Sequence, residues 1–354
     1  MKHINADTMK KILIALALVT AAALLTCCSS EDISDRTYVI FETDIGNDID
    51  DALALDMLYK YMDWGMIELS AVMLNKCSSA PGEYMDIMNT WYGYPDIPVG
   101  IVRNGADDIW GKYAQDVVDL KNGDGTPMFA RTHSDYDRLP DAHILYRKVL
   151  ASKPDNSVVI ASVGFSTNLA RLLDTPADEY SPLDGKELVA KKVRLLVPMA
   201  GHMSDPDYHE YNVIKDVPAA QKVFAEWPTQ MVVSPFEVGL AIEYPGASIA
   251  DDCAWADKHP MVESYRAFGK GNIMYDRPTW DLTAVLYAVE GGSWFTVSEP
   301  GSIVITDEGS SIFTPSADGK VRYMMITPEQ GQAINERFQE IVSQKPAKST
   351  ADEN

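Results

Sequence analysis

Apolar residues recur along the chain in short runs that alternate with longer helical repeats. The first run, Tyr38-Val39-Ile40-Phe41, is β-branched and aromatic and therefore predicts a buried strand. Residues 52–59 carry apolar side chains at the spacing of an amphipathic helix. The alternation then continues, with strands expected at 67–75, 157–163, 193–199 and 230–234, and helices at 84–92, 142–152, 168–173 and 219–227.

Strands that alternate with helices are typical of an α/β fold with an open, mostly parallel sheet and helices on both faces. Near the C-terminus, residues 302–306 and 321–326 predict a small antiparallel addition to this sheet. Thr327-Pro328-Glu329-Gln330 has the pattern of a capping box and opens a last helix that we expect to end near Val342.

No linker rich in Gly, Pro or Ser interrupts the middle of the chain, so we expect one large domain over residues 37–342. Residues 343–354 are polar and are expected to form a disordered tail. The segment 104–140 has little periodicity and is rich in Gly, Asp and aromatic residues, which predicts a long loop over the active-site face.

The N-terminus has the features of a targeting segment. Two lysines precede an apolar run at 12–25, which has the length of a signal h-region rather than of a membrane span. Leu25-Thr26-Cys27-Cys28 follows and resembles a bacterial lipobox. We therefore predict a lipoprotein signal peptide at 1–27 and a lipid on Cys28, with Cys27 as the alternative register.

This anchor would be followed by a polar tether at 28–36 and would attach the protein to a membrane of the bacterial cell envelope, at the periplasmic face or the cell surface. Two cysteines remain, Cys77 and Cys253, which are too few for a disulfide framework and are expected to be free thiols.

The chain of 354 residues carries a formal net charge of −22. Such a surface repels phosphate backbones, so we do not expect a nucleic-acid partner. The acidity suits a divalent cation but does not by itself locate a site.

The most informative stretch is Glu42-Thr43-Asp44-Ile45-Gly46-Asn47-Asp48-Ile49-Asp50-Asp51, between a predicted strand and a predicted helix. Ligands of open α/β sheets bind beyond the carboxyl ends of the strands. Carboxylates crowded at such a place repel one another, so a bound cation would keep them ionised. Hard oxygen ligands favour Ca²⁺ or Mg²⁺ over Zn²⁺.

Three other interpretations of this acidic loop fit less well. An EF-hand counted from Asp44 would need Gly and Glu where Ile49 and Leu55 stand. The pattern of phosphatases with an aspartyl nucleophile also fits poorly. A helix-capping turn could explain Asp50 or Asp51 alone, but explains the whole cluster less easily.

The acidic loop resembles the signature of the inosine–uridine-preferring nucleoside hydrolases, Asp-x-Asp-Pro-Gly-x-Asp-Asp-Ala. The matching residues are Asp44, Gly46, Asp50, Asp51 and Ala52. Three departures are visible: Glu42 replaces the first Asp, Ile45 replaces Pro, and residues 47–49 fill the space of one residue. The longer loop leaves open whether Asp48 or Asp50 takes the role of the first Asp of the pair.

Further segments resemble the family in the same order along the chain. Asn75 follows the second strand, where the family has a sugar-contacting Asn. The other segments are Gly164-Phe165-Ser166-Thr167-Asn168, Val197-Pro198-Met199-Ala200-Gly201, His209-Glu210-Tyr211-Asn212 and Trp280-Asp281-Leu282-Thr283-Ala284.

The resemblance implies a Ca²⁺-dependent hydrolase that converts a ribonucleoside, or a related ribosyl compound, to ribose and free base. Asp44 would be the general base toward water. The metal ligands would be Asp44, Asp51, the carbonyl of Thr167, and Asp281. Substrate would be held by Asp48 or Asp50, Asn75, Asn168, Glu210, Asn212 and Trp280.

Activation of the leaving group is not determined by these motifs. Trp280 occupies the place where many family members have His, and an indole can stack on a base but is a poor acid. The segment 104–140 offers four unranked candidates: Trp110, Tyr113, His133 and Tyr136. A non-catalytic nucleoside- or sugar-binding lipoprotein of an uptake system stays open as an alternative, as does assembly into a homo-oligomer.

Overall fold

The computed structural model describes residues 36–106 and 112–350. The chain divides into two units, Met1–Arg36 and Thr37–Asn354, and only the second is described below. The predicted signal peptide, lipid-bearing Cys28 and nearly all of the tether lie outside the described residues, as does Trp110. Within the described part, no helix combines the length and the apolar character needed to cross a membrane.

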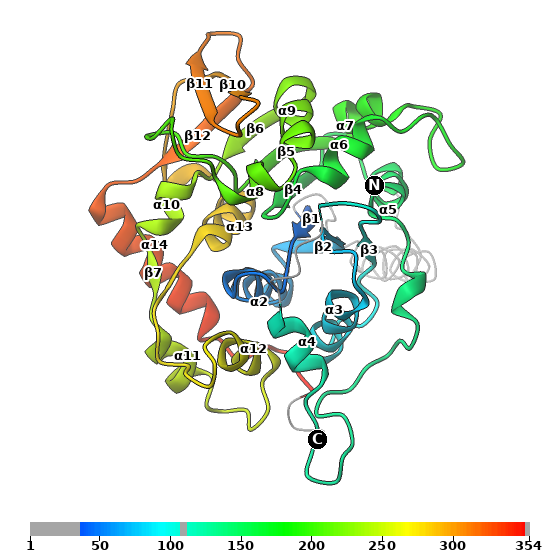
Figure 1. Ribbon diagram of the computed structural model, residues 1–354, viewed down its shortest axis with the longest axis vertical. Coiled ribbons are helices and arrows are strands. Elements are labelled where there is room, and N and C mark those ends of the chain that lie inside the picture. The colour runs from blue at the N-terminus through cyan, green and yellow to red at the C-terminus, as the bar shows by residue number, and fades with distance from the viewer. Residues whose placement is uncertain (1–35, 107–111, 351–354) are drawn as a thin grey trace, which may run out of the picture. The chain divides into compact units, whose positions relative to one another are not determined.

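A ten-stranded sheet runs through the unit in the order β11-β10-β12-β6-β5-β4-β1-β2-β3, and β9 pairs with β12 (Figure 1). Its parallel strands are β1 (Thr37–Thr43), β2 (Ile67–Leu74), β3 (Val99–Ile101), β4 (Val158–Ser162), β5 (Val193–Pro198), β6 (Gln230–Val233) and β12 (Val321–Met325). The antiparallel strands are β9 (Thr296–Val297), β10 (Gly301–Ile305) and β11 (Ser311–Pro315). A separate two-stranded sheet pairs β7 (Glu243–Tyr244) with β8 (Arg277–Pro278).

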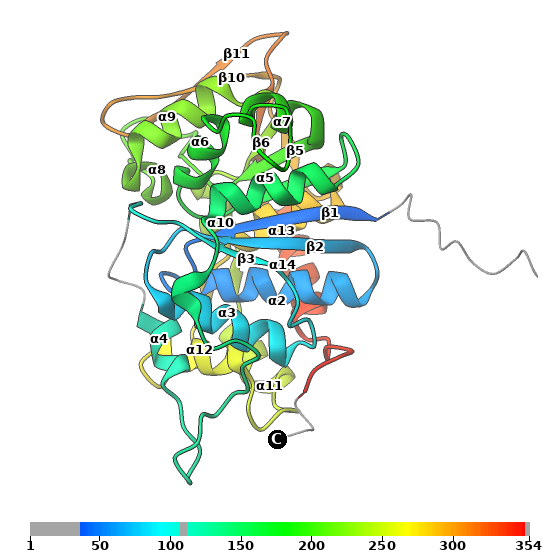
Figure 2. The same cartoon turned by 90° about the vertical axis from the view of Figure 1, so that its right-hand side faces the viewer.

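Successive side chains of β1 point to opposite faces of the sheet, so this strand contributes to two cores. Val39 and Phe41 pack in one core, and Ile40 packs in the other. Helices cover both faces (Figure 2). The first core includes α2 (Asp50–Asp63), α3 (Ser79–Trp91), α13 (Trp280–Glu290) and α14 (Pro328–Val342); the second includes α5 (Ala142–Ser152), α6 (Thr167–Leu173), α7 (Gly185–Lys192) and α9 (Val217–Glu226). The predicted fold class is confirmed.

Shorter helices complete the unit. Two of them, α8 (Tyr211–Lys215) and α10 (Phe236–Leu240), follow β5 and β6 and so lie near the carboxyl ends of the parallel strands. The remaining three are α4 (Lys112–Val118), α11 (Gly246–Asp252) and α12 (Pro260–Phe268), of which α4 contacts α3 and α12.

The C-terminal part of the sheet differs in detail from the sequence prediction. The two predicted strands correspond to β10 and β12, which pair antiparallel at Gly301 and Val321. β12 also runs parallel to β6 and so joins the main sheet, and the antiparallel addition contains a further strand, β11, that was not predicted. The capping box is present: the hydroxyl of Thr327 accepts from the backbone N–H of Gln330, whose side chain accepts from the backbone N–H of Thr327.

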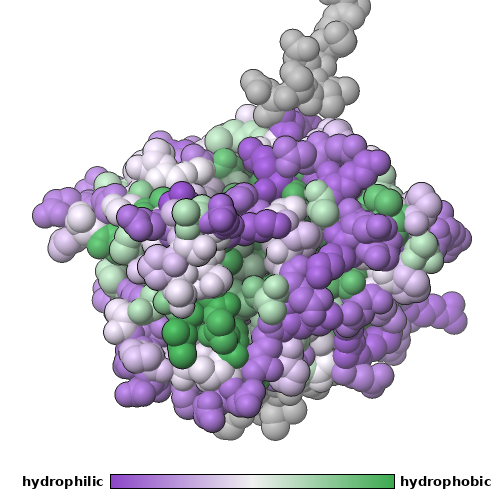
Figure 3. All heavy atoms as spheres, turned by 90° about the horizontal axis from the view of Figure 1, so that it is seen from above, coloured by the Kyte–Doolittle hydropathy of each residue, from purple (hydrophilic) through white to green (hydrophobic). Residues whose placement is uncertain are grey.

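The surface beside β10 and β11 is largely hydrophilic, with apolar side chains between the polar ones (Figure 3). Val304 and Ile312 face each other across these two strands and are exposed. A mostly polar exterior is what the acidic composition predicts.

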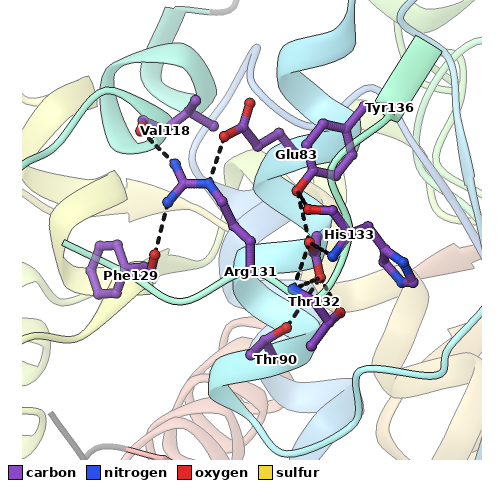
Figure 4. A network of polar contacts seen from close by, with 9 residues as sticks. Glu83, Thr90, Val118, Phe129, Arg131, Thr132, His133 and Tyr136 are labelled. Atoms are coloured by element: carbon purple, nitrogen blue, oxygen red, sulfur yellow. Dashed lines mark hydrogen bonds and ion pairs between the residues drawn. The ribbon is translucent and has the colours of Figure 1, made fainter. Parts of the chain in front are cut away.

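The described parts of the segment 104–140, residues 104–106 and 112–140, do not form a free loop. They include α4 and a turn of 3-10 helix at Tyr136–Arg138, and side chains bind them to α3. Asp86 of α3 accepts from the backbone N–H groups of Thr132 and His133, at 3.0 and 2.8 Å, and from the hydroxyl of Tyr136, at 2.8 Å (Figure 4). Burial alone would raise the pKa of Asp86, but these donors outweigh it and lower the pKa.

Arg131 reinforces the same attachment. Its Nε donates to Glu83 of α3 at 2.5 Å, and its two terminal nitrogens donate to the carbonyls of Val118 and Phe129 (Figure 4). Polar contacts thus supplement the buried apolar side chains of Tyr113, Val117 and Phe129 in holding this segment. These apolar residues are too widely spaced along the chain to give a clear helical or strand period.

The first residues of the C-terminal tail also differ from the expected disorder. The backbone N–H of Ala347 donates to Asp63 at 2.7 Å, and the ammonium group of Lys348 lies 4.4 Å from the centre of the Tyr94 ring. Such contacts use polar groups and bury little apolar surface, so the composition of residues 343–350 does not predict them.

Candidate active site

The acidic loop connects β1 to α2 at the carboxyl end of the central strand, beside the start of α13 (Figure 1). A pocket opens there, at the place where open α/β sheets bind ligands. It is lined by Asp44, Asn47, Asp48, Asp50, Asp51, Val163, Met199, Glu210, Tyr211, Asn212, Phe236, Trp280 and Asp281.

Three buried carboxylates meet at the floor of this pocket. Asp50 and Asp51 belong to the first turn of α2, and Asp281 belongs to the first turn of α13. One carboxylate oxygen of each of these three residues lies within 4.8 Å of the corresponding oxygens of the other two. The backbone N–H of Asp281 donates to Asp50 at 3.0 Å, and the hydroxyl of Thr43 donates to Asp51. The two helix N-termini thus bring together residues that are far apart in the sequence.

Burial and mutual repulsion make this cluster costly without a cation. Burial, followed by the negative charges of the neighbouring carboxylates, raises the pKa values of Asp51 and Asp281 well above the ordinary range. Asp50 behaves in the same way. Burial also raises the pKa of Asp44 to about 6, against the opposing charge of Lys76. A divalent cation would remove this penalty.

The donor set fits a hard cation. The three clustered side chains offer carboxylate oxygens alone, and Asp44 lies close enough for its charge to raise the pKa of Asp51. Ca²⁺ and Mg²⁺ prefer such oxygen ligands. The site could therefore hold the predicted metal through Asp51 and Asp281, with Asp44 or Asp50 beside them.

The structure places the two candidates for the first Asp of the pair differently. Asp50 joins the cluster with Asp51 and Asp281. Asp48 lines the pocket but forms an ion pair with Arg277, whose Nε donates to its Oδ1 at 2.8 Å. Asp50 thus lies among the clustered carboxylates and Asp48 is paired with a cation, while the sugar-binding role of either residue stays a prediction.

Glu210 and Asn212 form a polar wall of the pocket. The carboxylate of Glu210 caps α8 by accepting from the backbone N–H groups of Asn212 and Val213, at 2.8 and 3.1 Å. Its burial raises its pKa to about 7. The side-chain amide of Asn212 donates to the carbonyls of Val163 and Met199, at 3.0 and 3.1 Å. Both side chains are thereby fixed before a ligand arrives.

Asn75 and Asn168 do not line the pocket as was expected of sugar-binding residues. Both are buried beneath it around Glu42, which accepts from Asn75 at 2.8 Å and from the hydroxyl of Tyr146 at 2.6 Å. The side-chain amide of Asn168 donates to the carbonyl of Leu74 at 3.2 Å. These side chains support the strand ends that carry the pocket.

Thr167 is also absent from the pocket lining. It begins α6, is buried, and its hydroxyl donates to Asp216. The predicted ligation by its carbonyl stays a prediction.

The far end of the pocket is aromatic. The rings of Phe236 and Trp280 stack with centroids 5.3 Å apart, and the indole N–H of Trp280 donates to the carbonyl of Phe236 at 2.9 Å. Tyr208 packs on Phe236 from behind, at 4.5 Å between centroids. This end suits the flat face of a heterocyclic base.

None of the described candidates for the leaving-group acid lines the pocket. Tyr113 is buried, and His133 and Tyr136 belong to the attachment on Asp86. Their sequence signal was a loop rich in aromatic residues, and the fold directs that segment to α3.

Sequence reasoning missed Asn47, Tyr211, Phe236 and Arg277. Tyr211 lies inside a matched motif, and Phe236 follows a predicted strand, so position along the chain could have suggested both. Arg277 carries no comparable signal, because its role depends on a partner at Asp48.

Comparison with known protein families matches residues 39–348 to the family described as inosine-uridine preferring nucleoside hydrolase. A comparison with curated protein sequences finds no significant match.

Solved structures share the fold. A plant nucleoside hydrolase aligns with a TM-score of 0.64 and 16% identity, over 87% of this chain and 99% of its own. A purine-preferring ribonucleoside hydrolase from Gardnerella vaginalis gives 0.62 and 15%, over 86% and 99%. An inosine-uridine preferring nucleoside hydrolase from Bacillus anthracis gives 0.58 and 16%, over 86% and 99%.

The fold and the acidic pocket thus define an α/β protein with a buried cluster of carboxylates at the carboxyl ends of its parallel strands. The family match spans most of the sequence, so the chain belongs to the inosine-uridine preferring nucleoside hydrolase family and is a nucleoside hydrolase. The resemblance predicted from the acidic loop is confirmed.

Proposed function

We propose that this nucleoside hydrolase cleaves the N-glycosidic bond of ribonucleosides with the help of a bound Ca²⁺ ion. The observation that carries the proposal is the cluster of Asp50, Asp51 and Asp281 in the same pocket as Asp44 and Glu210. When bound there, Ca²⁺ would supply a Lewis acid for water and a grip on the ribose diol.

The residues of the pocket would carry out the remaining steps of the reaction. Asp44 is the candidate general base, because its buried carboxylate lines the pocket beside the cluster. It would take a proton from water as the water oxygen bonds to the anomeric carbon. The bond from that carbon to the base breaks in the same step, through an oxocarbenium-like transition state, and its electron pair goes to the base nitrogen.

The polar wall and the floor would hold the sugar. Glu210 and Asn212 line the pocket and are fixed by their own hydrogen bonds, so they lose little conformational entropy when they bind hydroxyl groups. Asp50 is the corresponding candidate on the floor.

The departing base would rest on the aromatic end. Stacking on Trp280 and Phe236 would orient it, but the indole N–H already donates to a carbonyl and is a poor acid. Neither Phe236 nor Trp280 is a ready proton donor, so the proton for the base would come from solvent, from the sugar side or from His202, whose ring lies 5.7 Å from that of Phe236.

The test is hydrolysis of a nucleoside panel by protein stripped of metal and then restored with Ca²⁺. Release of ribose and free base in equal amounts, lost on stripping and recovered on restoration, is the expected result. Equal rates in stripped and restored protein would refute metal dependence, and binding without release would favour a binding protein.

We further propose that Cys28 carries a lipid that anchors the enzyme in the bacterial cell envelope. The support is the sequence Leu25-Thr26-Cys27-Cys28 after an apolar run. Cys28→Ser should move the protein from the membrane fraction to the soluble fraction, whereas release only by Cys27→Ser would shift the register by one residue.

A further inference from the structure

The ion pair between Asp48 and Arg277 joins two distant segments at the rim of the pocket. Nε of Arg277 donates to Oδ1 of Asp48 at 2.8 Å, and a terminal nitrogen donates to Oδ2, so the contact is bidentate. Bidentate pairs fix orientation as well as charge. Asp48 belongs to the lengthened part of the acidic loop, and Arg277 belongs to β8.

The guanidinium group of Arg277 is also held by aromatic rings. It lies 5.2 Å from the centre of the Phe268 ring and 5.4 Å from that of the Trp280 ring. The side chain of Arg277 is half-buried, so burial and these ring contacts restrict its conformation independently of the ion pair with Asp48.

Arg277 is firmly linked to the start of α13. Only Pro278 and Thr279 separate it from Trp280, and the hydroxyl of Thr279 donates to the carbonyl of Ile242 at 3.0 Å. The backbone N–H of Thr279 donates to the carbonyl of Gly239 at 3.1 Å. These hydrogen bonds fix the short segment that joins Arg277 to the first turn of α13, where Asp281 lies.

Besides apolar packing, two polar contacts between described residues connect the acidic loop to the segment 277–281: the pair Asp48–Arg277, and the hydrogen bond from Asp281 to Asp50. The second involves the carboxylate cluster itself, whereas the first lies outside it. We propose that Arg277 and Asp48 are positioning residues, which clamp the acidic loop against α13 and so set the spacing of the carboxylates that bind the metal.

This inference rests on the proposed metal-dependent function and differs from a simple charge effect. Arg277 alone is a positive charge near a cation site, so removing it should tighten cation binding if only charge mattered. Asp48 alone has the opposite effect. Removing both charges together leaves the net charge unchanged and isolates the geometric contribution of the clamp.

The test is the Ca²⁺ affinity of the double variant Asp48→Asn with Arg277→Met, measured by calorimetry on protein stripped of metal. Partners that orient metal ligands from outside the site are commonly worth about ten- to a hundredfold in metal affinity. We expect a loss in that range. Arg277→Lys keeps the positive charge but cannot form the bidentate contact, so it should lose less Ca²⁺ affinity than the double variant.

Arg337→Met is a matched control, because Arg337 of α14 pairs with the last residue of α13, at the end of that helix opposite Asp281. Arg337 pairs with Glu290 at 2.7 Å and lies 5.4 Å from the Trp64 ring, so it repeats the chemistry of Arg277 away from the pocket. Its loss should lower the melting temperature but leave Ca²⁺ affinity within about twofold of the parent.

The outcomes separate the two proposals. A parent protein that binds no Ca²⁺ would overturn the proposed metal dependence together with the clamp. A parent that binds Ca²⁺ and a double variant of equal affinity would overturn the clamp alone. An equal loss in Arg337→Met would also overturn it, because the effect would then be a general loosening of α13.

Discussion

The two ends of the pocket are built in different ways. The metal end is made of carboxylates in the first turns of α2 and α13, and its members Asp50 and Asp281 are 1% and 4% exposed. The aromatic end combines Trp280 of α13 with residues of the short helices α8 and α10, and Tyr211 of α8 is 38% exposed. The metal end is therefore held by core helices alone, whereas the aromatic end is built partly on short surface helices.

Because of this difference, we expect that substitutions at the aromatic end can change substrate preference without disturbing the residues that carry out hydrolysis. Shifting Asp281 would require moving α13, which packs against α2 and the sheet. Replacing Phe236 or Tyr211 disturbs only a short helix at the rim. We infer that base preference can change without loss of the hydrolytic site, and the following experiments test how far the two ends are independent.

The largest effect is expected at the metal end. Asp44→Asn keeps the size of the side chain but removes its charge and basicity, so the turnover rate at saturating Ca²⁺ should fall by roughly a hundred- to ten-thousandfold. Ribose release measures this. Asp86→Asn, which loosens the segment bound to α3, is the control and should lose stability while keeping its rate; a near-parental rate in Asp44→Asn would place the base elsewhere.

Removal of the metal should have the next largest effect, which we expect as a decrease in the free energy of unfolding. A ligand that binds only the folded state adds about 3 kcal/mol to the free energy of unfolding at a hundredfold excess over its dissociation constant. Thermal unfolding with Ca²⁺ and with chelator gives the difference. Phe236→Leu should show the same chelator effect as the parent, since the aromatic end does not bind the ion.

The pH dependence of the metal-free protein tests the electrostatics of the metal end. Burial raises the pKa of Asp44 to about 6 and that of Glu210 to about 7, so the folded state binds protons that the unfolded state has released. This contribution to stability is present below the unfolded pKa values, near 4, and is lost as the pH rises toward 7.

Chemical denaturation at several pH values should therefore show metal-free protein becoming less stable from about pH 4 to about pH 7, and Ca²⁺ should reduce this slope by favouring ionised carboxylates. An unchanged slope with saturating Ca²⁺ would mean that the ion does not contact the cluster.

The smallest effect is expected at the aromatic end. Phe236→Leu removes one ring of the stack, and aromatic pairs are worth about 0.5–1.5 kcal/mol beyond their burial. The KM for a purine nucleoside should rise roughly two- to tenfold with little change in kcat. A large fall in kcat would show that this end takes part in bond breaking, and the separation between the two ends would then be wrong.

The sequence predicted the metal end better than the aromatic end for a physical reason. Asp44, Asp51 and Asp281 lie in motifs next to strong apolar runs, which fix the strand and helices that carry them. Phe236 and Tyr211 lie on helices of five residues, too short to show a helical period.

The alignment of the acidic loop with the family pattern and the pairing of short strands also could not be predicted from the sequence. The lengthened loop left Asp48 and Asp50 equivalent until the fold placed Arg277 beside one of them. β3 has three residues and β11 has five with little apolar alternation, so neither strand was predicted. These features depend on contacts between segments that are distant along the chain.

The contact between Asp48 and Arg277 also has an evolutionary consequence. The acidic loop is two residues longer than the family pattern, and the longer loop is the part that carries Asp48. A longer loop without its arginine would leave an unpaired carboxylate beside the cluster, whereas an arginine without its aspartate would leave a cation facing a cation site. The insertion and the arginine should therefore be inherited as one unit, and related chains should gain or lose them together.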